Sequence, residues 1–95
     1  MKTIHQYITE KLKISKSSYN YHPKTREELK ELVKKLISER GNEADLNDID
    51  TSKITNMSDL FVFNEFFNGD ISLWNVSNVT DMTRMFYECK NLKSI

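Results

Sequence analysis

Only a few side chains in this sequence have the chemistry of catalysis or metal binding. Cys89 is the single thiol, and a catalytic thiol needs a neighbouring base that the sequence does not assign. His5 and His22 stand alone, without the CxxC or HExxH spacing of a zinc site. The stretch DLNDID at 45–50 begins like a calcium loop, but Ile49 and the residue after it replace the next ligand and the glycine. We therefore predict no catalytic residue, no metal site and no cofactor.

Other common catalytic signals are missing as well. No GxSxG motif accompanies the serines, and two glycines cannot build a phosphate-binding loop. Cys89 and Met82 are two helical turns apart, so we expect the thiol on the same helical face as a small buried group. The Asn-x-Ser/Thr sequons at Asn56, Asn75 and Asn78 arise within a repeated pattern in which Ser and Thr serve turns and caps. The sequence predicts that this protein is not an enzyme.

The composition predicts one small folded domain. The 95 residues are 38% hydrophobic and 29% charged, with enough aromatic side chains to form a core. A single cysteine cannot form an internal disulfide, and the opening stretch MKTIHQYITEKLKIS lacks the unbroken apolar run of an export signal. No apolar run is long enough to span a membrane. We therefore predict a cytoplasmic protein.

The charges are distributed unevenly along the chain. Residues 1–40 carry ten Lys or Arg against five Asp or Glu, and residues 41–95 carry four against nine. This bias is typical of ordinary solvated surfaces, but it also allows head-to-tail association or nucleic-acid binding by the basic half. The candidate nucleic-acid contacts are Lys11, Lys13, Lys16, Lys24, Lys30, Lys34 and Lys35, with Tyr19 and Tyr21 available to stack on bases.

Helical patterns dominate the first half of the sequence. Apolar residues at helical spacing predict a short helix over residues 3–13, and alternating tyrosines before Pro23 predict a brief extended stretch. The strongest pattern predicts a helix over 25–40: Thr25 and Glu28 form a capping box, an apolar stripe follows, and Gly41 ends it.

The second half of the sequence repeats itself. Residues 46–61 align with residues 71–86. In this alignment, NMSDLF at 56–61 corresponds to DMTRMF at 81–86. Most apolar positions recur, including Met57 with Met82. A repeat of this length cannot bury its apolar edge alone, and therefore stacks on a neighbour. We expect the methionines, Met85 included, to pack in the core, with an adaptable binding surface as the alternative.

The repeated segment resembles the BspA-like leucine-rich-repeat surface proteins, whose repeats read approximately W-D-V-S-N-V-T-x-M-x-x-M-F. The matching stretches are WNVSNVTDMTRMF at 74–86 and, more loosely, IDTSKITNMSDLF at 49–61. This resemblance implies a recognition scaffold that binds proteins through its repeat face. Family members are mostly exported and adhesive, so a truncated surface adhesin is one alternative that the resemblance leaves open.

These patterns together predict an α+β fold. We expect a small leucine-rich-repeat-like, right-handed coil of two strand-turn-helix repeats, capped by N-terminal helices. The predicted organisation is a helical cap at 1–43 and two repeats at 44–95, about 46–70 and 71–95, in one compact domain. The repeat helix is expected to place Met82, Met85, Phe86 and Cys89 on one side.

The last repeat has no following repeat to cover it, which predicts an interaction surface. Phe86, Leu92 and Ile95 are the candidate partner-binding residues, and a homodimer through this end is one candidate assembly. The function that we predict is a non-enzymatic binding module. Its working form is a small intracellular protein, encoded by a phage or mobile element, that binds and blocks a host protein or nucleoprotein, as an anti-CRISPR inhibitor does. Direct nucleic-acid binding is the alternative.

Overall fold

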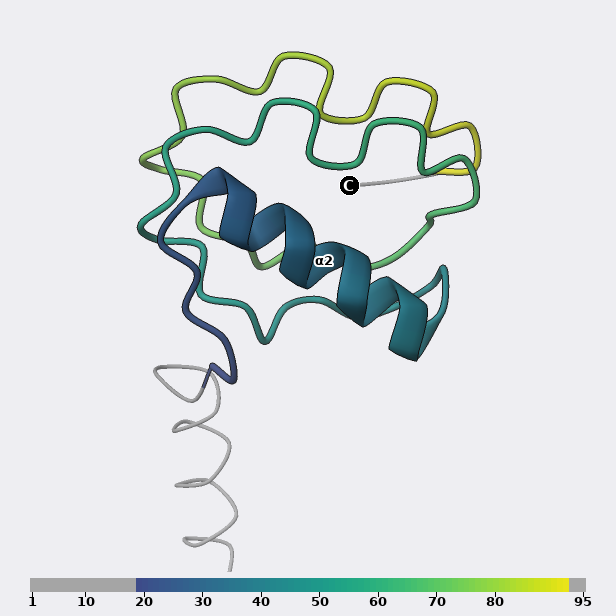
Figure 1. Ribbon diagram of the computed structural model, residues 1–95, viewed down its shortest axis with the longest axis horizontal. Coiled ribbons are helices and arrows are strands. Elements are labelled where there is room, and N and C mark those ends of the chain that lie inside the picture. The colour runs from purple at the N-terminus through teal and green to yellow at the C-terminus, as the bar shows by residue number, and fades with distance from the viewer. Residues whose placement is uncertain (1–18, 93–95) are drawn as a thin grey trace, which may run out of the picture.

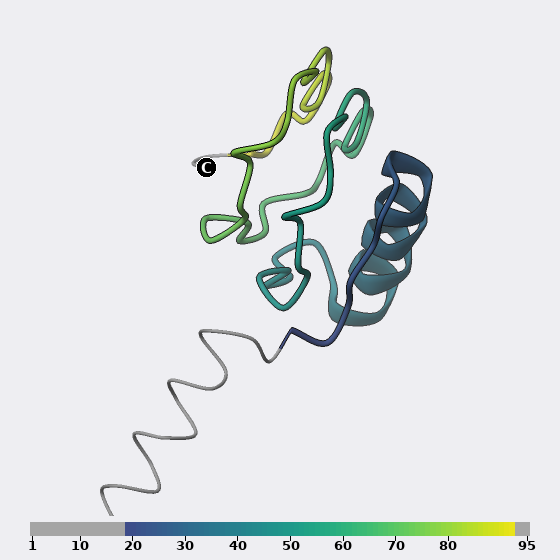
Figure 2. The same cartoon turned by 90° about the vertical axis from the view of Figure 1, so that its left-hand side faces the viewer.

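The computed structural model describes residues 19–92, which form one α-helix followed by two coils of turns. The helix, α2, spans Arg26–Arg40. We call residues 44–68 the first coil and residues 69–92 the second coil. Figures 1 and 2 show that α2, the first coil and the second coil lie side by side in that order, so that α2 covers one end of the stack and the second coil forms the other.

Helix α2 forms where the sequence predicts a helix. The Thr25 hydroxyl accepts a hydrogen bond from the Glu28 N–H at 3.2 Å, which satisfies a free donor of the first turn. The Glu28 carboxylate in turn accepts from the Lys24 N–H at 2.8 Å. At the other end, Gly41 has a φ of 94° and donates its N–H to the Ile37 carbonyl at 2.8 Å. The prediction for residues 25–40 is confirmed, whereas the helix predicted for residues 3–13 lies outside the described residues.

The two coils are stacked in parallel, with the same offset as the repeat in the sequence. Parallel bridges join Asp45 to Asp70 and Asn56 to Asp81. The N-terminal side is held by a third bridge, from Tyr21 to the first coil. Each bridge is isolated, so the described residues contain no continuous strand and no sheet.

Asp and Asn side chains make the turns of both coils. In each case the side-chain Oδ1 accepts a hydrogen bond from the backbone N–H of the second residue along the chain, at 2.8–3.0 Å. The six residues are Asp45, Asp50 and Asn56 in the first coil, and Asp70, Asn75 and Asp81 at the same positions of the second coil. These turns bend the chain at short intervals and leave no segment long enough for a strand.

The predicted α+β fold of strand-turn-helix repeats is therefore wrong. The segment expected to be a repeat helix is a series of turns, because Arg84 and Glu88 have positive φ values of 53° and 61°. Asp59 and Phe63 have the same conformation in the first coil, at 57° and 63°. A left-handed residue every fourth position interrupts a right-handed helix, and tight turns close instead, such as the one from the Met85 N–H to the Met82 carbonyl.

One hydrophobic cluster joins α2 to both coils. Phe61 is fully buried at its centre, with ring centroids 4.6 Å from Phe67, 5.4 Å from Phe86 and 5.8 Å from Trp74. The Trp74 indole N–H donates to the Leu46 carbonyl at 2.9 Å, so its polar group is satisfied inside the stack. The apolar face of α2 completes the cluster through Leu29, Val33 and Leu36. Of the methionines in the repeats, Met57 and Met85 are buried and Met82 is exposed.

An ion pair ties the end of α2 to the first coil. Both terminal nitrogens of Arg40 donate to the Asp48 carboxylate at 2.9 Å, in a bidentate arrangement. Asn20 donates to the same carboxylate at 2.8 Å. The hydrogen bond from Arg40 is the main cause that lowers the pKa of Asp48 from 3.8 to about 2.

We expect Asp48→Asn to remove a pH-dependent part of the stability. Because the pKa of Asp48 is lower in the folded state, its contribution is complete above about pH 4 and is lost as the pH falls through about 2. About a quarter of this side chain is exposed, so we expect the contribution to be roughly 1–2 kcal/mol. Urea unfolding between pH 2 and 6 measures it. Glu43→Gln removes one carboxylate without changing this ion pair, and should retain the wild-type difference between pH 2 and 6.

Candidate protein-binding site

The exposed end of the second coil contains an apolar groove of about 260 Å³. We call it the end groove. It lies on the outermost layer of the stack, which in Figure 2 is the layer farthest from α2. The residues that line it are Ile71, Ser72, Trp74, Val76, Met82, Met85 and Phe86. Apart from Ser72, every lining side chain is apolar, which is typical of a surface that binds another apolar surface.

The apolar residues of the end groove occupy positions that are buried in the first coil. Val76 and Met82 are 41% and 46% exposed. Their counterparts one repeat earlier, Thr51 and Met57, are at most 1% exposed because the second coil covers them. Side chains at these two positions of the repeat are therefore buried in the first coil and exposed to solvent in the second coil. The groove is the surface left when no further coil is present.

The floor of the end groove is fixed by the core beneath it. The ring of Phe86 stacks on that of Phe61 at an interplanar angle of 10°. The thiol of Cys89 donates to the Phe61 carbonyl at 2.9 Å. Burial raises the pKa of this thiol, which is opposite to the activation that a catalytic cysteine needs. The hydrogen bond of Cys89 therefore lies beside the stacked rings of Phe61 and Phe86.

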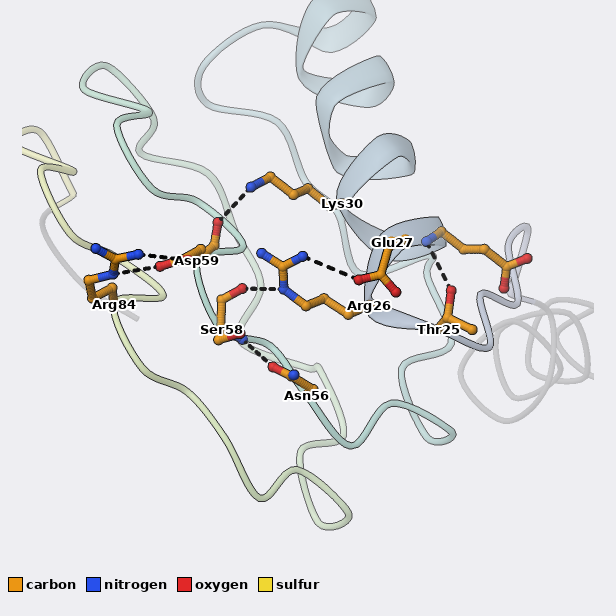
Figure 3. Close-up of polar contacts among 9 residues, drawn as sticks. Thr25, Arg26, Glu27, Lys30, Asn56, Ser58, Asp59 and Arg84 are labelled. Atoms are coloured by element: carbon orange, nitrogen blue, oxygen red, sulfur yellow. Dashed lines mark hydrogen bonds and ion pairs between the residues drawn. The ribbon is translucent and has the colours of Figure 1, made fainter.

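The other end of the stack is closed by basic side chains of α2. Arg26 donates through Nε to the Ser58 carbonyl at 2.5 Å, and Lys30 donates through Nζ to the Asp59 carbonyl at 3.2 Å (Figure 3). Arg84 from the second coil donates to both carboxylate oxygens of Asp59, at 2.9 and 3.0 Å. That contact is the largest cause of the lowered pKa of Asp59. The two ends of the stack thus differ, one covered by a helix and one open.

One of the three predicted partner-binding residues lines the end groove. Phe86 lines the end groove and Leu92 is half-buried against the core, whereas Ile95 lies outside the described residues. Sequence reasoning missed Trp74, Val76 and Met82 as groove residues. The repeat alignment contained part of the signal, because it pairs each of these positions with a residue that is buried in the first coil.

Four of the lysines proposed for nucleic-acid binding lie in the described part of the chain. Lys24, Lys34 and Lys35 are exposed, and Lys30 is partly buried in its contact with the first coil. The remaining three, Lys11, Lys13 and Lys16, lie outside the described residues. Nucleic-acid binding stays a prediction from the sequence.

Within residues 19–92, no group of three or more metal-ligating side chains comes together. His22 Nδ1 lies 3.4 Å from Asp50, whose pKa is lowered mainly by hydrogen bonds from Ser52. Asp45 accepts a hydrogen bond from the N–H of Asn47 in a turn, as a strand-entry or loop residue would.

None of the helices in this part of the chain is long and apolar enough to cross a membrane.

Comparison with known families gives one match. The sequence pattern of the family described as "Mycoplasma protein of unknown function, DUF285" matches residues 5–94, nearly the full chain. No curated protein and no solved structure shows a significant match. The resemblance to BspA-like repeats stays a prediction.

Proposed function

Because this chain belongs to the DUF285 family, whose description assigns no function, we propose from its geometry that it is a non-enzymatic binding module. The end groove takes an apolar segment of a partner protein, or of the protein part of a nucleoprotein, and so occupies and blocks that surface of the partner. One observation carries the proposal: Val76 and Met82 are exposed at positions that the repeat otherwise buries. Large exposed apolar surfaces mark interaction sites on soluble proteins.

We place this activity in the cytoplasm. The single cysteine, Cys89, is half-buried as a free thiol that hydrogen-bonds to the backbone. The fold is held by packing and by turn-forming side chains, and both are independent of oxidation. Stability of this kind suits a reducing compartment.

We expect Met82→Glu and Val76→Glu to weaken partner binding at least about tenfold, because each places a charge in the end groove. The immobilised full-length chain is used to capture proteins from a lysate of the organism that carries the gene, and mass spectrometry identifies them. Nuclease treatment of half the lysate separates a protein partner from a nucleic acid. The affinity of the identified partner is then measured for each variant.

Leu73→Glu is the matched control for these variants. Leu73 is 75% exposed in the second coil but does not line the end groove, so its substitution adds the same charge to a neighbouring surface. It should leave the affinity within about twofold of the wild type. If Leu73→Glu weakens binding as much as Met82→Glu, or if neither groove variant weakens it, the end groove is not the binding site. A partner that disappears with nuclease would instead support direct nucleic-acid binding.

A further inference from the structure

The two coils share one backbone conformation, which shows the groups that the second coil directs outward. Positive φ values recur at equivalent positions of the repeat, at Asp59 and Arg84 and again at Phe63 and Glu88. The turn hydrogen bonds recur in the same way: the Leu60 N–H donates to residue 57, and the equivalent Met85 N–H donates to residue 82. A group that points from the first coil to the second therefore has a counterpart that points away from the stack.

Between residues 57 and 63, four backbone N–H groups of the first coil donate to the second coil at 2.8–2.9 Å. They belong to Met57, Asp59, Phe61 and Phe63, and the acceptors are the carbonyls of Asp81, Thr83, Met85 and Tyr87. The equivalent N–H groups of the second coil are those of Met82, Arg84, Phe86 and Glu88, and no residue between 19 and 92 accepts a hydrogen bond from them. We call this row the donor edge. It runs beside the end groove, since Met82 and Phe86 belong to both.

Between residues 82 and 88 the donor edge offers donors without acceptors, which restricts what can bind to that row. The carbonyls of Thr80 and Lys90, which are equivalent to the accepting carbonyls of Thr55 and Glu65, flank the row in the sequence. The carbonyls that alternate with it already accept hydrogen bonds from the first coil. An ordinary strand offers N–H and C=O groups in turn along its edge, so part of its donors would face donors here. A second copy of this chain, docked open end to open end, would bring one row of N–H groups against another. Unpaired donors buried in an interface oppose binding.

A second copy cannot offer its acceptor face either. The carbonyls that would match the donor edge are the first-coil equivalents of those that accept in the second coil, and α2 packs on that side of the first coil (Figure 2). One of these carbonyls, that of Ser58, accepts a hydrogen bond from the side chain of Arg26 on α2. Copies of this chain therefore do not continue the stack, and the matching surface has to come from a coil that is not covered by a helix.

We propose that the end groove and the donor edge together bind a coil of the same repeat pattern carried by another polypeptide. The inference rests on the proposed function and names its class of partner. The second coil seated on the first shows the interface inside this molecule: it supplies four carbonyls to the N–H row and places Phe86 and Trp74 against Phe61. The two copies of the pattern between residues 44 and 92 are already stacked on each other, so the incoming coil lies outside these residues.

The test uses the full-length chain and a synthetic peptide of residues 70–92, the sequence that already covers the first coil. Amide hydrogen exchange is followed by NMR on the labelled chain at increasing peptide concentration. We expect exchange at Met82, Arg84, Phe86 and Glu88 to slow by roughly tenfold or more, because these amides gain acceptors. A scrambled peptide of the same composition and a Thr/Val strand peptide are the controls, and protection by either of them would overturn the proposal.

A tethered version removes the entropic cost of capturing a free peptide. The full chain is extended after Ile95 by a second copy of residues 71–95, which continues the repeat without a change of register. The same four amides are expected to become protected. If they exchange as fast as in the parent chain in both experiments, the proposed partner class is rejected. A captured partner that still depends on Met82 would then leave the proposed function in place with a different kind of ligand.

Discussion

Phe61→Ala is expected to lower the free energy of unfolding by about 3–5 kcal/mol, the usual range for an aromatic residue removed from a core. Phe61 is fully buried, and its ring centroid lies 4.6, 5.4 and 5.8 Å from those of Phe67, Phe86 and Trp74. Its removal opens a cavity between the two coils. A domain of this size has only about 5–15 kcal/mol of stability in total, so the variant should be close to unfolding.

Urea unfolding followed by the fluorescence of Trp74 measures this loss, and Phe63→Ala is the matched control. Phe63 has the same side chain and lies in the same series of turns, but it is 68% exposed and its ring lies edge to face with that of Tyr87 at 5.7 Å. We expect its substitution to change stability by less than about 1 kcal/mol. Equal losses in the two variants would contradict a core centred on Phe61.

Gly69→Ala is expected to destabilise the fold by about 2–3 kcal/mol, through lack of space. A methyl group at this position would overlap the carbonyl oxygen of Ala44 and would lie 2.5 Å from the nearest carbon of the Phe67 ring. The carbonyl cannot give way cheaply, since it accepts the hydrogen bond of the Asp70 N–H at 2.9 Å. The two coils therefore pack closely at Gly69, because glycine has no side chain between the backbone and the Ala44 carbonyl.

Thermal unfolding of Gly69→Ala and Leu73→Ala separates this effect from a general sensitivity of the second coil. Leu73 is 75% exposed, so its truncation should change the melting temperature little. Gly69 does not have a left-handed backbone, so a loss of stability in Gly69→Ala could not be explained by backbone strain. Wild-type stability in that variant would mean that the two coils are less closely packed at Ala44.

The features that sequence reasoning predicted correctly depend on local signals or on the repeat. Helix α2 was predictable because Thr25, Glu28 and Gly41 mark its ends in the sequence. The register of the stack was predictable because the alignment of the two repeats pairs Asn56 with Asp81, and the structure joins these two residues by a bridge. Both predictions needed only the order of the residues along the chain.

The conformation of each coil was not predictable from apolar spacing. Helical spacing is seen at Met82, Met85, Phe86 and Cys89. Arg84 nevertheless adopts a positive φ, and an arginine in the sequence does not predict this conformation. The Asp and Asn residues at the turns were visible, yet their side chains serve strand ends and loops equally well. The end groove depends on which positions lack a covering coil, and this is a property of the stacked structure.

The covering of one end of the stack by α2 has an electrostatic consequence. From residue 56 to 63 and again from 81 to 88, the peptide groups that join the coils point their oxygens toward α2 and their hydrogens away from it. Aligned peptide dipoles add, as they do along a helix axis, so the α2 side carries partial negative charge, and Arg26 and Lys30 neutralise it there. The opposite side carries partial positive charge from the N–H groups of the donor edge, and it should favour a ligand with carboxylates at its rim.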